Sequence, residues 1–162
     1  MGYNFSMGKK VGFTGTQKGA HPAQIAAAKE KLKALKEEGF DEFHHGACIG
    51  ADEQVAKIAK ELGFKVIAHP GLAKDPANMQ FRSDWNGSDE TLGAKPFIDR
   101  DHDIVDATET MLATPLTYEE QNRSGTWTTV RYAKKQGRVE GQSLHVIKPP
   151  WTPPKWLTPK EV

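Results

Sequence analysis

Short apolar runs alternate along the chain with segments in which apolar side chains recur every three or four positions. The short runs are typical of buried strands, and the longer spacing is typical of amphipathic helices. Strands are predicted over residues 10–16, 41–47, 65–69, 110–114 and 144–148. Helices are predicted over residues 22–38, from about residue 52 to 62, over 95–107, and after Gly125. This alternation predicts a doubly wound α/β fold, with a mostly parallel sheet of about five or more strands and helices on both faces.

Two segments interrupt this alternation. Residues 70–94 are rich in Gly, Pro, Asp and Asn and show no sustained period, so we expect a loop that forms a lid or rim. Residues 150–162 form a tail rich in Pro and Trp, which cannot extend the sheet and lies either over its own domain or against a neighbouring subunit. The expected organisation is therefore an N-terminal extension over residues 1–8, one domain over 9–149, and this tail.

Glycine and small polar residues stand at three strand-to-helix junctions, residues 15–17, 46–52 and 123–127. The carboxyl ends of parallel strands lie at one edge of a sheet, so the three loops are expected to converge there. Glycine leaves backbone N–H groups open, and the start of a helix carries partial positive charge. This edge is therefore predicted to bind a ligand that bears a phosphate group.

Composition narrows the classes of function. The 162 residues include 22 Lys and Arg and 21 Asp and Glu, so a net charge of +1 provides no general basic surface for nucleic acid. Cys48 is the single cysteine, which excludes an internal disulfide framework and a metal site made of several cysteines. The six histidines show no metal-ligand spacing, and neither a metal nor a cofactor is expected. The first ten residues lack the apolar run of a signal peptide, and no segment has the length of apolar sequence that spans a membrane, so a cytoplasmic protein is expected.

Three longer stretches carry a family resemblance. They are HHGACIGADEQVAKIAKELGFKVIAHP, KPFIDRDHDIVDATETMLATP and RSGTWTTVRYAKK. Together they resemble the SLOG superfamily of Rossmann-like nucleotide-binding proteins, which includes the YspA/YpsA-like proteins, the DprA-type DNA-processing proteins and the LOG phosphoribohydrolases. The resemblance covers about residues 9–149. It implies binding of a nucleotide or nucleotide-derived ligand, and self-association into a homodimer or larger assembly.

The turn at Gly125 and Thr126 is similar to the second half of the LOG-type PGGxGTxxE signature. This resemblance implies that the amides of Ser124, Gly125 and Thr126 hold a phosphate, with added positive charge from Arg123. Thr129 stands at the glutamate position of the signature. The catalytic acid of the phosphoribohydrolases is therefore absent from its usual place.

The candidate ligand-binding residues lie on the three junctions and at nearby element ends. Arg100 and Arg123 are suited to a phosphate, because a guanidinium donates two parallel N–H groups. Asp52 either caps the helix that it begins or accepts hydrogen bonds from a ribose hydroxyl. His69, at a strand end, either contacts the ligand or bonds within its loop. The full set is Gly15, Thr16, Gln17, Gly46, Gly50, Ala51, Asp52, His69, Arg100, Arg123, Ser124, Gly125 and Thr126.

The primary hypothesis is a protein that binds a nucleotide-like small molecule and associates with copies of itself, without nucleic acid or membrane as a partner. Two alternative functions stay open. One is hydrolysis of the N-glycosidic bond of a nucleoside monophosphate, with Asp52, Glu119 or Glu120 as the catalytic carboxylate. The other is DNA binding of the DprA type, which the near-neutral charge and the lack of a basic and aromatic stripe disfavour.

Overall fold

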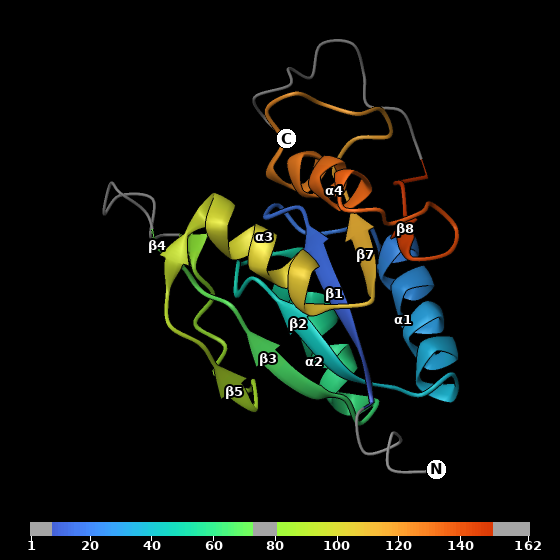
Figure 1. Cartoon of the computed structure of the whole chain (residues 1–162), viewed down its shortest axis with the longest axis vertical. Helices are drawn as coiled ribbons and strands as arrows, with labels where there is room; N and C mark the ends of the chain where they lie inside the picture. The colour runs from blue at the N-terminus through green and yellow to red at the C-terminus, as the bar shows by residue number, and fades with distance from the viewer. Residues whose placement is uncertain (1–7, 73–80, 151–162) are drawn as a thin grey trace.

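The structure is a computed structural model that describes residues 8–72 and 81–150. At its centre is a six-stranded parallel sheet in the order β5-β3-β2-β1-β7-β8 (Figure 1). The strands are β1 (Lys9–Gly15), β2 (Phe40–His45), β3 (Lys65–Ala68), β5 (Glu90–Thr91), β7 (Thr110–Thr114) and β8 (Leu144–Val146). The helices are α1 (Pro22–Glu37), α2 (Ala51–Glu61), α3 (Phe97–Ala107) and α4 (Gly125–Lys135). The predicted Rossmann-like α/β fold is confirmed.

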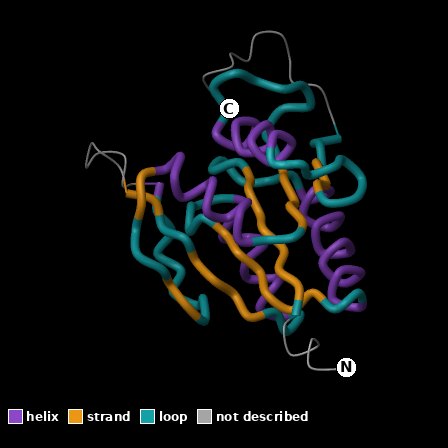
Figure 2. The backbone as a smooth tube through the Cα atoms, in the orientation of Figure 1, coloured by secondary structure: helices purple, strands orange, loops and turns teal. Residues whose placement is uncertain are grey.

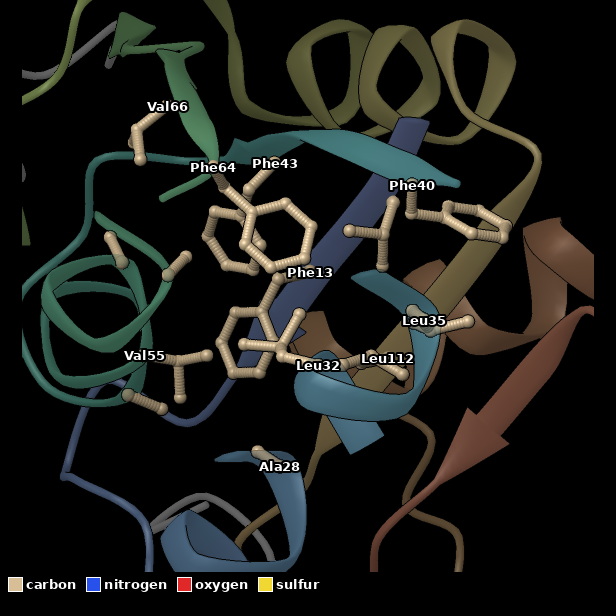
Figure 3. Close-up of a cluster of buried hydrophobic side chains, with 14 residues drawn as sticks. Phe13, Ala28, Leu32, Leu35, Phe40, Phe43, Val55, Phe64, Val66 and Leu112 are labelled. Atoms are coloured by element: carbon tan, nitrogen blue, oxygen red, sulfur yellow. The ribbon is translucent and has the colours of Figure 1, made fainter. Parts of the chain in front are cut away.

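Helices cover both faces of the sheet (Figures 1 and 2). α1 and α2 pack on the face that presents Phe13, Phe43 and Leu112, and α3 and α4 pack on the opposite face. Figure 3 shows the first of these cores, in which the rings of Phe13 and Phe43 stack with centroids 6.0 Å apart. Successive side chains of a strand point to opposite faces, so Met111 and Ala113 join the second core while Leu112 joins the first.

The segment 70–94 is more regular than its composition predicts. β4 (Gly71–Leu72) pairs with β6 (Lys95–Pro96), and β5 adds a strand to the main sheet beside β3. The prediction of a loop without regular structure is therefore wrong for the residues of β4 and β5. Strands of two residues pair through their backbone groups and are too short to show a hydrophobic period in the sequence. Residues 73–80 lie outside the described residues, as does the Pro- and Trp-rich tail from residue 151 onward.

None of the helices in the described chain is long and apolar enough to cross a membrane.

The start of α2 lies against the end of β1. The Ala51 amide donates a hydrogen bond to the Thr16 carbonyl at 2.9 Å. Gly50, just before the helix, has a φ of 81°, a conformation that favours glycine. A Cβ at Gly15 would lie 2.5 Å from Thr114 Oγ1 and 2.6 Å from Ala51 Cβ, closer than real Cβ atoms approach. The absence of a side chain at Gly15 therefore lets α2 begin directly beside β1.

We expect Gly15→Ala to lower the free energy of unfolding by about 1–3 kcal/mol, because the added methyl group must displace Ala51 or Thr114. Urea unfolding followed by circular dichroism measures the change. Gly93→Ala is the matched control, since no atom of the described part of the chain lies within 4 Å of a Cβ placed there. Equal stability of the two variants would contradict the close contact between α2 and β1.

Candidate functional site

A cavity of about 340 Å³ lies at the carboxyl edge of the sheet. Its walls come from the end of β1, the loop between β2 and α2 with the start of α2, one side of α3 and the start of α4. Each of the three glycine-containing junctions contributes to these walls. The lining residues are Phe13, Thr14, Gly15, Thr16, Gln17, Gly46, Cys48, Asp52, Phe81, Phe97, Arg100, Asp101, Ile104, Arg123, Gly125 and Thr126.

The start of α4 forms one end of the cavity, with Gly125 and Thr126 in its wall. Ser124 is buried and caps the helix, since its Oγ accepts a hydrogen bond from the Trp127 amide at 3.2 Å. Among the described residues, no group accepts from the amides of Gly125 and Thr126. These N–H groups and the helix dipole favour an anion. Arg123, an exposed side chain in the same wall, adds positive charge.

Thr16 organises the turn between β1 and α1. Its amide donates to the Thr114 carbonyl at 3.1 Å, and its own carbonyl accepts from the Ala51 amide. The Thr16 Oγ1 also accepts a hydrogen bond from the Lys18 amide at 3.1 Å, so backbone groups and the Thr16 hydroxyl together fix the turn. Gly15, Thr16 and Gln17 all line the cavity, as three of the predicted ligand-binding residues.

Asp52, the second residue of α2, places a buried carboxyl group at the other end of the cavity. Its Oδ2 accepts hydrogen bonds from the Gly46 amide at 3.0 Å and the Cys48 amide at 3.3 Å. Burial raises the pKa of Asp52 to about 7, although the Arg100 charge and the two amides oppose this shift. The side chain therefore closes the loop that precedes its own helix and holds a proton up to near-neutral pH.

Arg100 joins several parts of the wall, and its side chain is only 7% exposed. Nη1 donates to the carbonyl oxygens of Gly46 and His69, the second at 3.2 Å. Nε donates to Asp101 Oδ1 at 2.6 Å, and Nη2 donates to Cys48 Sγ at 3.7 Å. Protein groups thus occupy most of the five N–H donors of this guanidinium. Arg100 holds the ends of β2 and β3 in position, a role that the sequence did not predict.

The sequence also did not single out Asp101, Phe81 or Phe97 as site residues, although all three line the cavity. Burial raises the pKa of Asp101, against the opposing effect of Arg100. Neighbouring helix positions normally point in different directions, so the prediction of Arg100 as a site residue did not indicate that Asp101 lies in the same site. Phe81 belongs to the segment without a hydrophobic period, where no sequence pattern marks it.

Cys48 is a lining residue whose thiol stays protonated. Burial raises its pKa to about 12, and the Asp52 charge adds to this shift. Within residues 8–72 and 81–150, no three His, Cys, Asp or Glu side chains are grouped in a way that could hold a metal ion.

Several of the predicted site residues do not line the cavity. Nε2 of His69 lies 2.7 Å from Nδ1 of His44, and burial lowers the pKa of His69 to about 4. Glu119 and Glu120 are exposed, and Glu120 forms an ion pair with Arg131 at 2.7 Å. The predicted residues outside the lining set are Gly50, Ala51, His69, Ser124, Glu119 and Glu120.

No family model matches the chain, and no curated protein matches it. Its fold is similar to that of the molybdenum cofactor binding protein from the phototrophic bacterium Rippkaea orientalis, with a TM-score of 0.62 and 18% identity over 87% of this chain and 77% of that one. DNA processing protein A from Helicobacter pylori matches with a TM-score of 0.57 and 17% identity, over 89% of this chain and 67% of that one. The Moco carrier protein from Chlamydomonas reinhardtii matches with a TM-score of 0.57 and 19% identity, over 88% of this chain and 78% of that one. At these identities the likeness concerns the fold alone, a Rossmann-like α/β fold.

We expect Asp52→Asn to change how stability depends on pH. Folding raises the carboxyl pKa from 3.8 to about 7, so the free energy of unfolding of the wild type falls as the pH rises from about 4 to about 7. The slope is at most about 1.4 kcal/mol per pH unit. Asn does not titrate and keeps an oxygen for the Gly46 and Cys48 amides. The wild-type stability minus that of the variant should therefore decrease over this range in urea unfolding.

Asp103→Asn is the matched control for this measurement, because the Asp103 side chain is 40% exposed and pairs with Lys95 at the surface. Between about pH 4 and pH 7, the stability difference between the wild type and this control should change less than the difference between the wild type and Asp52→Asn. If the difference in the free energy of unfolding between the wild type and Asp52→Asn does not change with pH, the assignment of Asp52 as a buried, protonated carboxyl group is wrong.

Proposed function

We propose that this chain binds a nucleotide or nucleotide-derived ligand in the cavity, with a phosphate group at the start of α4. The observation that carries the proposal is the pair of Gly125 and Thr126 amides, which find no acceptor among the described residues and share their wall with Arg123. Open amides at a helix start, a helix dipole and a guanidinium favour phosphate over a neutral group. Ser124 supports this arrangement by capping the helix, which leaves the two amides ahead of Trp127 for the ligand.

The remainder of the cavity suits a planar heterocycle. Phe81 and Phe97 contribute aromatic surface, and Asp52 and Arg100 contribute polar groups. A volume of about 340 Å³ lies within the range that small-molecule sites occupy. One charged end and one aromatic, polar end together fit a nucleoside monophosphate better than inorganic phosphate alone.

We expect Gly125→Asp to lower the affinity for nucleoside monophosphates at least about tenfold, because the new carboxylate repels the phosphate. Among the described residues, no atom outside the α4 backbone lies within 4 Å of a Cβ at Gly125, and an acidic residue in the first turn of a helix is favourable, so the variant should fold. Isothermal titration calorimetry with a panel of nucleotides measures the change. Gly93→Asp introduces the same charge at another open glycine and should bind like the wild type. Unchanged affinity in a folded Gly125→Asp variant would contradict the phosphate site.

Hydrolysis of an N-glycosidic bond is a second candidate function. It is favoured by Asp52 and Asp101, which both line the cavity and whose pKa values are both raised by burial. A carboxyl group that retains its proton near neutral pH suits protonation of a departing base. Glu119 and Glu120 lie outside the lining set, so Asp101 replaces them as a candidate acid. Incubation with nucleotides followed by mass spectrometry separates the two functions: free base with ribose phosphate would indicate hydrolysis, and a retained, unaltered nucleotide would indicate binding alone.

Single-stranded DNA requires its own test, because DNA processing protein A from Helicobacter pylori is described by its single-stranded DNA binding mode. Two other proteins of similar fold are described as binding or carrying the molybdenum cofactor, so that cofactor belongs in the ligand panel. The net charge of +1 disfavours DNA as the main ligand. We expect no gel shift with an oligonucleotide, and a shift that weakens as salt is added would favour DNA binding instead.

A further inference from the structure

We infer, on the basis of the proposed phosphate site, that the ligand presents a lactam edge, a ring N–H beside a carbonyl, to Asp52 and Arg100. Hypoxanthine, guanine and pterins carry such an edge, whereas adenine carries an amino group beside an unprotonated ring nitrogen. Three features of the cavity support this inference. They are the separation of the two ends of the cavity, an oxygen of Asp52 that accepts no hydrogen bond from a described group, and an N–H of Arg100 that has no acceptor among the described residues.

The order of the strands separates the two ends of the cavity. β1 lies between β7 and β2, α4 follows β7, and α2 follows β2. Neighbouring strands are about 4.8 Å apart, so the ends of β7 and β2, which lead to α4 and α2, are about 10 Å apart across β1. Arg123 adds positive charge at the α4 end, whereas at the α2 end the carboxyl groups of Asp52 and Asp101 offset the charge of Arg100. A phosphate at α4 therefore directs the rest of the ligand toward Asp52.

Asp52 provides an acceptor at this end. The Gly46 and Cys48 amides both donate to Oδ2. In the part of the chain that the structure describes, no group donates to Oδ1, and the residue lines the cavity. A carboxylate in a buried site is stabilised by additional donors. An N–H group of a ligand supplies such a donor.

Arg100 provides a donor beside this acceptor. Nη1 uses both of its N–H groups on the carbonyls of Gly46 and His69. Nε donates to Asp101, and Nη2 uses one N–H on Cys48. A guanidinium has five N–H groups, so one on Nη2 remains without an acceptor among the described residues. The guanidinium also lies close enough to the carboxyl group at the start of α2 to lower its pKa.

An acceptor next to a charged donor distinguishes a lactam from adenine. In one pose, the lactam N–H donates to Asp52, and its carbonyl accepts from Arg100. Adenine in the same pose directs a nitrogen lone pair at the carboxylate and an amino hydrogen at the guanidinium, so both contacts become repulsive. A site that hydrogen-bonds a ligand in this way rejects the mismatched analogue strongly, because its own polar groups are left unpaired.

Inosine monophosphate and adenosine monophosphate are a matched pair for the test, because they share ribose and phosphate and differ at this edge. We expect the wild-type protein to bind inosine monophosphate at least about tenfold more tightly in isothermal titration calorimetry. Guanosine monophosphate should follow inosine monophosphate, since it has the same lactam. A pterin monophosphate that binds more tightly than guanosine monophosphate would identify a pterin, rather than a purine, as the source of the lactam.

Asp52→Asn should abolish this preference, because Asn turns its oxygen to the Gly46 and Cys48 amides and presents N–H donors to the ligand. Binding of adenosine monophosphate through its phosphate should persist, which shows that the variant is folded. Asp103→Asn removes a carboxylate from the surface of α3 and should keep the full preference.

The preference of the wild type should also weaken as the pH falls from about 8 to about 6, because the pKa of Asp52 is about 7 and its protonated form no longer accepts the lactam N–H on equal terms. Arg100 and Asp101 on α3 and Cys48 in the preceding loop are the charged or titratable groups that act on Asp52. The phosphate ionises alike in both nucleotides, so its effect cancels in the ratio of affinities.

Each outcome bears on a different proposal. Equal or tighter binding of adenosine monophosphate by the wild type would overturn the lactam inference and leave the phosphate site intact. Loss of both nucleotides in Gly125→Asp would then confirm that site. Failure of the wild type to bind either nucleotide would instead overturn the proposed function itself. A preference for inosine monophosphate that survives in Asp52→Asn would remove Asp52 from the inference.

Discussion

The cavity depends on the burial of one guanidinium group. Arg100 extends from α3 and donates to the main-chain carbonyls of Gly46 and His69, which follow the ends of β2 and β3. A buried cation is costly unless its donors are satisfied, so these loops cannot move away without leaving charge unpaired. The loop after β2 carries the amides that bind Asp52, and its position therefore follows from Arg100. One side chain thus connects α3, β2 and β3 at the edge of the sheet where the cavity lies.

Two arginines of the cavity wall have different physical roles because of their burial. Arg100 is buried, and its charge is balanced by Asp101 and by the carboxyl group of Asp52. Arg123 is exposed, and none of the described acidic groups pairs with it. Of the two, only Arg123 carries a charge that no described acidic group offsets. The cavity therefore has an unbalanced positive charge near the start of α4, whereas carboxyl groups accompany the positive charge of Arg100 near the start of α2.

Thr129 stands where the LOG-type signature has glutamate, and an acidic residue of another helix lies beside it. Asp101 on α3 forms a side-chain hydrogen bond with Thr129 on α4, and Asp101 lines the cavity. A carboxyl group is therefore present beside the position where the signature has glutamate, although it comes from α3. Burial raises its pKa, and Arg100 limits this shift. Asp101 is thus a buried carboxyl group near Thr129 that belongs to α3 rather than to α4.

The sequence by itself determined the α/β fold and most of its elements, because short apolar runs and hydrophobic periods of three to four are local properties of a chain. It also placed the three glycine junctions at one sheet edge, because parallel strands align their carboxyl ends. Only the tertiary structure decided that Asp101 joins the cavity while Glu119 and Glu120 do not, and that Arg100 is buried while Arg123 is exposed. These outcomes depend on how α3 crosses the sheet and on which charges are desolvated there. No local pattern reports either of them, because both arise from groups far apart in the sequence.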